Sequence, residues 1–284
     1  MSLPDITPLK AWIGREAASE FMIDPWPAAA LTAALDRNDP PGPGAPLPPF
    51  WHHLYGLPVV RAAATGPDGH AARGGFLPPV PLERRMWAGG RLSWTGPLPV
   101  GAQVTRRSAV RSITAKEGRQ GPLVFVLVEH RFETAQGLAL VEEHDIVYRE
   151  APAPDAPQVE PPRAPERAAW QQVWLPDEVM LFRYSALTYN GHRIHYDERY
   201  VREVEGYPGL VVHGPLLATF LLDLVRRARP DATLARFEFR ALAPVFAGRE
   251  VIAYGTPDAR GAELWIADEK GGMVMRGRAD FAAG

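Results

Sequence analysis

A helix followed by four strand-like segments occurs twice in this 284-residue chain, and this repeat constrains the fold more than any other feature. In the first copy, Pro25–Arg37 favours a helix through its alanines and leucines, and Pro25 and Pro27 suit its first turn. Four apolar runs separated by turn residues follow and predict strands. These runs are Met86–Trp94, Val104–Ile113, Leu123–Phe132 and Ala139–Arg149.

The second copy begins with a short strand around Trp170–Trp174, a helical stretch from Glu178 and a long helix that starts near Pro215. Its four predicted strands are Arg236–Leu242, Glu250–Gly255, Ala262–Ala267 and Val274–Phe281. Two such units predict an α+β protein in which each antiparallel sheet wraps its own helix. Because an exposed sheet edge favours pairing, we expect the two sheets to join side by side, with the active site at their seam.

A proline-rich segment separates the two copies. The sequence APAPDAPQVEPPRAP cannot continue a helix or a central strand, as is typical of an extended linker. We therefore predict an N-terminal module over residues 1–150, a linker over 151–168 and a C-terminal module over 169–284.

Composition excludes several classes of function. The formal net charge of -2 and a pI near 6.5 lack the basic field of a nucleic-acid-binding protein. The chain has no cysteine, which excludes disulfides, thiolate catalysis and sulfur-ligated metals. No apolar run approaches the ~18 residues of a membrane span, and no signal sequence precedes the first copy, so a cytoplasmic protein without a membrane partner is expected.

Polar side chains concentrate in FRYSALTYNGHRIHYDERY, residues 182–200. His192 and His195 stand three residues apart, but Gly191 after Asn190 indicates a helix end and a turn. The cluster has no recognised metal spacing, so we expect no metal, although a metal site and a purely structural role are the alternatives. Histidine titrates near neutrality, so acid–base chemistry is the favoured interpretation.

A second signal lies where His213 and Gly214 open the long apolar helix. A helix N-terminus presents unpaired N–H groups and partial positive charge, so Gly214 could let a carbonyl oxygen approach and be polarised. The alternative is a simple tight turn between a strand and a helix.

These motifs give the chain a resemblance to the MaoC-type hydratases, whose pattern is roughly Gly-Asp-x-Asn-Pro-x-His followed by a His-Gly at the central hotdog helix. Aligned on its last histidine, the segment Tyr189–His195 matches this pattern at the catalytic histidine, His195, whereas Asn190 replaces the aspartate. Further segments resemble one branch, the mesaconyl-C4-CoA hydratases and mitochondrial 3-hydroxyacyl thioester dehydratases. They are WHHLYGLP, GGFLPPVPLERRMWAGG, KEGRQGPLVFV, NGHRIHYD and DIVYRE.

The resemblance implies a double hotdog fold, no metal or other cofactor, and an acyl-CoA or acyl-carrier-protein thioester as substrate. It also implies a chemically inactive N-terminal module that accommodates the acyl group; a homodimer is possible. We expect water to add reversibly across an enoyl-CoA double bond, with mesaconyl-C4-CoA, which gives citramalyl-CoA, as the first candidate. Dehydration of 3-hydroxyacyl carrier-protein thioesters in fatty acid synthesis is the alternative; a non-catalytic thioester binder and a thioesterase are further ones.

The predicted site assigns acid–base chemistry to His195, water or imidazole positioning to Asn190 and oxyanion stabilisation to the Gly214 N–H. Substrate-binding roles are predicted for Tyr189, Arg193 and His213. Since an amide cannot ionise, either His195 handles both proton steps or Asp197 supplies the missing carboxylate. His192 is expected near the entrance. Arg84 and Arg85 could reach CoA phosphates or a substrate carboxylate, or could be solvated surface charges.

Overall fold

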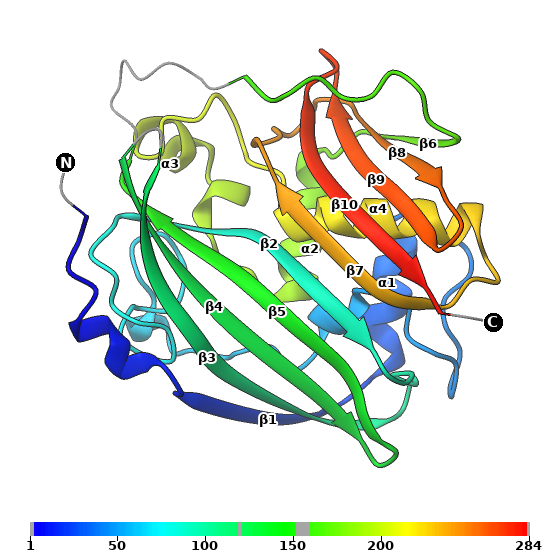
Figure 1. Ribbon diagram of the computed structural model, residues 1–284, viewed down its shortest axis with the longest axis horizontal. Coiled ribbons are helices and arrows are strands. Elements are labelled where there is room, and N and C mark those ends of the chain that lie inside the picture. The colour runs from blue at the N-terminus through cyan, green and yellow to red at the C-terminus, as the bar shows by residue number, and fades with distance from the viewer. Residues whose placement is uncertain (1–2, 119–120, 152–159, 283–284) are drawn as a thin grey trace.

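The computed structural model describes residues 3–118, 121–151 and 160–282, and its main feature is one ten-stranded antiparallel sheet (Figure 1). The strand order is β1-β3-β4-β5-β2-β7-β10-β9-β8-β6, so the first five strands form one side and the last five the other. The strands are β1 (Glu16–Met22), β2 (Arg84–Trp94), β3 (Gln103–Gly118), β4 (Gly121–Thr134), β5 (Gly137–Arg149), β6 (Trp170–Trp174), β7 (Leu234–Ala241), β8 (Val251–Pro257), β9 (Gly261–Asp268) and β10 (Met273–Phe281).

The two halves join where β2 pairs with β7, with Gly90 opposite Phe239 and Leu92 opposite Phe237. The expected α+β class and the expected joining of two sheets are therefore confirmed. In β4 the cause of strand formation is visible in the burial pattern, since Val124, Val126 and Val128 are buried and the residues between them are not. β1 was not predicted, because this exposed edge strand has no apolar alternation and is held by pairing with β3.

Figure 1 shows α1, α2 and α4 behind the sheet, and the helices differ between the halves. The α-helices are α1 (Pro25–Ala34), α2 (Glu178–Thr188), α3 (Glu198–Glu203) and α4 (Gly214–Ala228); the short 3-10 segments are η1 (Pro8–Trp12), η2 (Trp51–Leu54), η3 (Ala62–Ala64) and η4 (Arg193–His195). The 15-residue α4 packs on β6, β8, β9 and β10, with every residue from 216 to 225 buried. The 10-residue α1 ends before the predicted Arg37 and packs mainly against α2 and η2.

Two hydrophobic clusters form the core. The larger spans both halves and includes the buried face of α4, whereas the smaller lies in the N-terminal half between β3, β4 and the segment around Val80. Residues 152–159 of the predicted linker lie outside the described residues, and the module boundaries stay a prediction. Within the described ranges, no helix has the length and apolar character needed to cross a membrane.

Candidate active site

The segment between α2 and α3 is held in a defined turn. Tyr189, which caps the C-terminus of α2, has a left-handed φ of 50°, and the Asn190 side-chain oxygen accepts a hydrogen bond from the His192 N–H at 3.0 Å. An amide oxygen forms this local turn readily. Asn190 is therefore engaged in shaping the loop that presents His195.

His195 is buried, with 7% of its surface exposed, and its ring stacks on His213 at 3.6 Å between centroids. Its Nδ1 lies 2.7 Å from the Val211 carbonyl oxygen. A carbonyl can only accept, so Nδ1 carries the proton and Nε2 keeps a free lone pair. Burial lowers the pKa of His195 to about 4, partly opposed by the Val211 hydrogen bond. His195 is thus a neutral proton acceptor around pH 7.

The His213 ring stacks on that of His195 at the start of α4. His213 is fully buried, and its Nε2 lies 2.8 Å from the Ser185 hydroxyl oxygen. The Gly214 N–H, first in the helix, has no partner among the described residues. A Cβ added to Gly214 would lie 3.8 Å from the backbone oxygen of Trp87 in β2. The N-terminus of α4 therefore lies near the seam where β2 pairs with β7. His195, His213 and Gly214 are thus brought together, as the sequence predicted.

The other predicted residues have different surroundings. Tyr189 is 58% exposed. The Arg193 guanidinium donates to Asp197 at 2.8 and 3.0 Å and lies over the Tyr200 ring. The second Asp197 oxygen accepts from the Tyr200 N–H at 2.9 Å and caps α3. Both Asp197 oxygens are occupied, which leaves no free carboxylate at that position.

Arg84 and Arg85 are neighbours in β2 with different partners. Arg84 forms an ion pair with Glu205 at 3.0 Å and lies over the Tyr207 ring. Arg85 forms no ion pair within 4.0 Å in the described part of the chain, although its charge acts on the half-buried His192. Arg85 is therefore close enough to the histidine cluster for its charge to act on His70 and on His192.

Two residues that the sequence did not indicate reach the same cluster. Asp68 and His70 belong to a tight loop closed by the Thr65–Ala71 bridge in the N-terminal half. The ring centroids of His70 and His192 are 4.0 Å apart, and those of His192 and His195 are 5.5 Å apart. The only local signal is Asp-Gly-His after Gly-Pro, which predicts a turn but not its neighbours.

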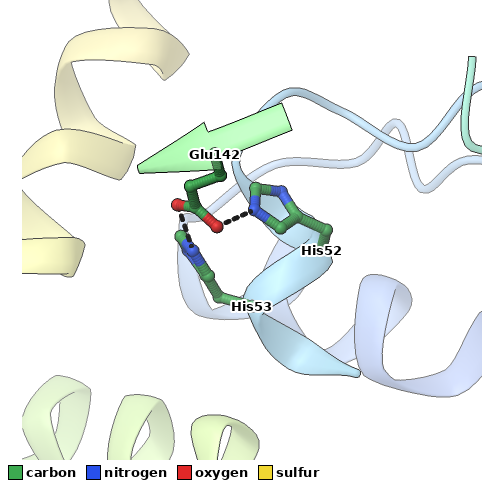
Figure 2. A group of neighbouring side chains, drawn as sticks. All are labelled: His52, His53 and Glu142. Atoms are coloured by element: carbon green, nitrogen blue, oxygen red, sulfur yellow. Dashed lines mark hydrogen bonds and ion pairs between the residues drawn. The ribbon is translucent and has the colours of Figure 1, made fainter. Parts of the chain in front are cut away.

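A second buried polar cluster lies beneath Trp87 in the N-terminal half. Figure 2 shows His52 and His53 of η2 reaching Glu142 of β5, with Nε2 to oxygen distances of 2.9 and 2.8 Å. The His144 Nε2 lies 3.0 Å from the same carboxylate without hydrogen-bond alignment. Burial alone would raise the pKa of Glu142, but the neighbouring histidines outweigh it and hold that pKa well below its ordinary value.

Both clusters contain atoms that a metal could bind, namely those of His52, His53 and Glu142 and those of Asp68, His70 and His192. In the first cluster the half-buried Arg106 already interacts with the Glu142 charge, and the His53 Nδ1 lacks the hydrogen-bond acceptor that usually orients a metal-bound histidine. In the second, the His70 and His192 rings are tilted by 40° to each other, and both Asp68 oxygens already accept hydrogen bonds from His70. Both sets fit hydrogen-bonded networks better than metal centres, so we assign no metal ligands.

Comparison with known proteins assigns the family. The model of the hydroxyacyl-thioester dehydratase type 2 family matches residues 50–247. The chain is 46% identical over 241 residues to the mesaconyl-C(4)-CoA hydratase of Chloroflexus aurantiacus, covering 83% of this chain and 84% of the relative. The chain belongs to the hydroxyacyl-thioester dehydratase type 2 family.

Other members and solved structures agree. The mitochondrial hydroxyacyl-thioester dehydratase type 2 of Schizosaccharomyces pombe is 26% identical, with 70% of this chain and 74% of the relative covered. HtdX of Mycobacterium tuberculosis superposes with a TM-score of 0.67 at 20% identity, covering 94% of this chain and all of that one. A second M. tuberculosis protein, described as a double hotdog, gives a TM-score of 0.57 at 16% identity, covering 95% and 96%. The predicted double hotdog fold of this dehydratase family member is confirmed.

Proposed function

We propose that this protein is an enoyl-CoA hydratase that adds water reversibly to mesaconyl-C4-CoA to form citramalyl-CoA. One observation carries the proposal: the buried His195, whose Nε2 keeps a lone pair, stacks on His213, the residue that precedes the α4 N-terminus at Gly214. This arrangement supports a site that combines a proton acceptor with a group that stabilises negative oxygen. The identity to the Chloroflexus hydratase supports the choice of substrate.

The chemistry follows from these two groups. His195 Nε2 takes a proton from water while the water oxygen bonds to Cβ and the double-bond electrons move to Cα and the thioester oxygen. The Gly214 N–H and the α4 terminus stabilise the enolate oxygen. His195 then returns the proton to Cα, so one imidazole serves both proton steps. Asn190 acts by holding the loop, and Tyr189, His213 and Arg193 stay predictions as substrate-binding residues.

The N-terminal half favours a short, anionic acyl group. The Glu142 cluster beside Trp87 makes the interior of this half polar, with the His144 ring 4.1 Å from the Trp87 ring, whereas a long alkyl chain would need an apolar channel. Arg85, beside His192, is our candidate for binding the free carboxylate of mesaconyl-C4-CoA. These features favour the dicarboxylic substrate over a carrier-bound fatty acyl chain.

The test follows the loss of conjugated enoyl-thioester absorbance with mesaconyl-C4-CoA and with crotonyl-CoA. We expect rapid hydration of the first, abolished by His195→Ala. Arg85→Gln should raise KM for mesaconyl-C4-CoA without weakening crotonyl-CoA hydration. Arg91→Gln is the matched control, because Arg91 lies on the same strand but pairs with Glu143 and Asp145.

Absence of hydration of both thioesters would overturn the proposal and would favour 3-hydroxyacyl-carrier-protein dehydration. The cytoplasmic location and the homodimer expected from the sequence stay predictions.

A further inference from the structure

The site as described contains no available carboxylate from its own loop. Asn190 stands where the related motif has aspartate, and its side-chain oxygen is used by the His192 N–H. Asp197 has both oxygens engaged, by Arg193 and by the Tyr200 N–H. A carboxylate that fixes an imidazole for proton chemistry must therefore come from elsewhere in the chain.

Asp68 of the N-terminal half is such a carboxylate. One of its oxygens accepts from the His70 backbone N–H at 3.0 Å, and the other lies 2.9 Å from the His70 Nδ1. Although burial opposes ionisation, hydrogen bonds from His70 hold the pKa of Asp68 well below its ordinary value. An ionised carboxylate only accepts, so the His70 Nδ1 carries the proton and its Nε2 keeps a lone pair.

The backbone fixes this pair against the catalytic loop. The Arg193 N–H donates to the Asp68 carbonyl oxygen at 2.9 Å, and the Arg193 side chain reaches the Pro67 oxygen at 3.1 Å. Gly69 and Gly191 meet so closely that a Cβ on Gly69 would stand 1.9 Å from the Gly191 oxygen. The loop is therefore docked at a contact that admits no side chain at Gly69.

We propose that Asp68 and His70 complete the active site from the N-terminal half, with the His70 Nε2 accepting the second hydrogen of the water that His195 activates. The proposal rests on the proposed function and adds a second anchor for the nucleophile. The first water proton passes to His195 and then to Cα, whereas the second stays on the oxygen and becomes the product hydroxyl. His70 thus aims the water at Cβ without any net proton transfer.

The physical reason for the pair lies in the tautomer of His70. Asp68 enforces a proton on Nδ1, so Nε2 can accept from water. The other charged or titratable groups near His70 are Arg73, Arg85, His192 and His195. None of them fixes the tautomer by a hydrogen bond within the described residues. Among the described residues, it is the Asp68 carboxylate that fixes the tautomer.

Asp68→Asn tests this reasoning, because the asparagine oxygen still accepts from the His70 backbone while its NH₂ donates to Nδ1. His70 would then carry its proton on Nε2 and could no longer accept from water. We expect kcat for mesaconyl-C4-CoA to fall by roughly 10²–10⁴-fold with little change in KM. Asp268→Asn is the matched control, because Asp268 accepts from the Lys270 N–H two residues on, in a turn between β9 and β10.

A long-range ¹H–¹⁵N NMR spectrum provides a readout that needs no substrate. We expect the His70 proton on Nδ1 in the native protein and on Nε2 in Asp68→Asn. A proton on the His70 Nε2 in the native protein would refute the proposed role of Asp68 and His70. An unchanged kcat in Asp68→Asn, with His195→Ala inactive, would refute it as well. If the native protein hydrated no thioester, the proposed function would fail. The NMR spectrum would still show whether Asp68 holds the His70 proton on Nδ1.

Discussion

Gly69→Ala should damage both the fold and the active site, and Gly101→Ala should damage only the fold. Both glycines adopt a left-handed backbone, with φ of +88° and +93°. That conformation costs a residue with a Cβ about 1–2 kcal/mol. Around Gly101 no heavy atom lies within 4 Å of the added Cβ, so this backbone cost is its whole effect.

At Gly69 the added Cβ would stand 1.9 Å from the Gly191 oxygen, whereas real Cβ contacts essentially never fall below 3.0 Å. The loop that carries His70 and the loop that carries His192 must therefore separate by about 1 Å or more. Misplacement of catalytic groups by about 1 Å can cost on the order of 10²-fold in rate. We expect kcat to fall by about this factor in Gly69→Ala and to stay native in Gly101→Ala.

Urea denaturation and steady-state hydration of mesaconyl-C4-CoA measure the two effects separately. Both variants should lose stability, Gly69→Ala more than Gly101→Ala, and only Gly69→Ala should lose kcat. A Gly69→Ala protein with native kcat would show that the loop contact does not position the site. Equal losses of kcat in both variants would refute the geometric argument.

Three further predictions concern the buried carboxylate and the histidines. Glu142→Gln should lower the free energy of unfolding by roughly 3–5 kcal/mol in urea denaturation, because it breaks a buried network. Glu143→Gln is the control, since Glu143 is half-exposed and its loss should lower the free energy of unfolding by under about 1 kcal/mol. Burial lowers the pKa of His53 and of His195 to about 4, whereas a histidine in the unfolded chain has a pKa of about 6.5. Because the unfolded chain binds protons first, the free energy of unfolding should fall as the pH drops from about 6.5 to about 4. A urea midpoint that does not change across that pH range would contradict this prediction. Dialysis against EDTA should leave kcat and Tm unchanged, and a loss restored by added Zn²⁺ would show that one of the histidine clusters holds a metal.

The repeat of a helix and four strands was readable from the sequence because apolar alternation and turn residues act locally. β6 was predicted at its observed bounds, and the start of α4 was predicted within one residue. β1 was missed because its residues are mostly exposed and its pairing with β3 depends on a distant strand. α3 was also missed, since its six residues depend on the Asp197 cap rather than on an apolar stripe.

The sequence also indicated the residues of the second half that we propose for the chemistry, since His195, His213 and Gly214 lie within twenty positions of one another. Only the tertiary structure decided the protonated nitrogen of His195, which the Val211 carbonyl sets, and the partner of Asn190, which is a backbone N–H.

The contribution of the N-terminal half was decided entirely by the fold. Asp68 and His70 are more than 120 positions from His195, and His52 is 90 positions from Glu142. Periodicity and turn signals report on neighbours along the chain, whereas these contacts form only when the two half-sheets join at β2 and β7 and their loops are brought together.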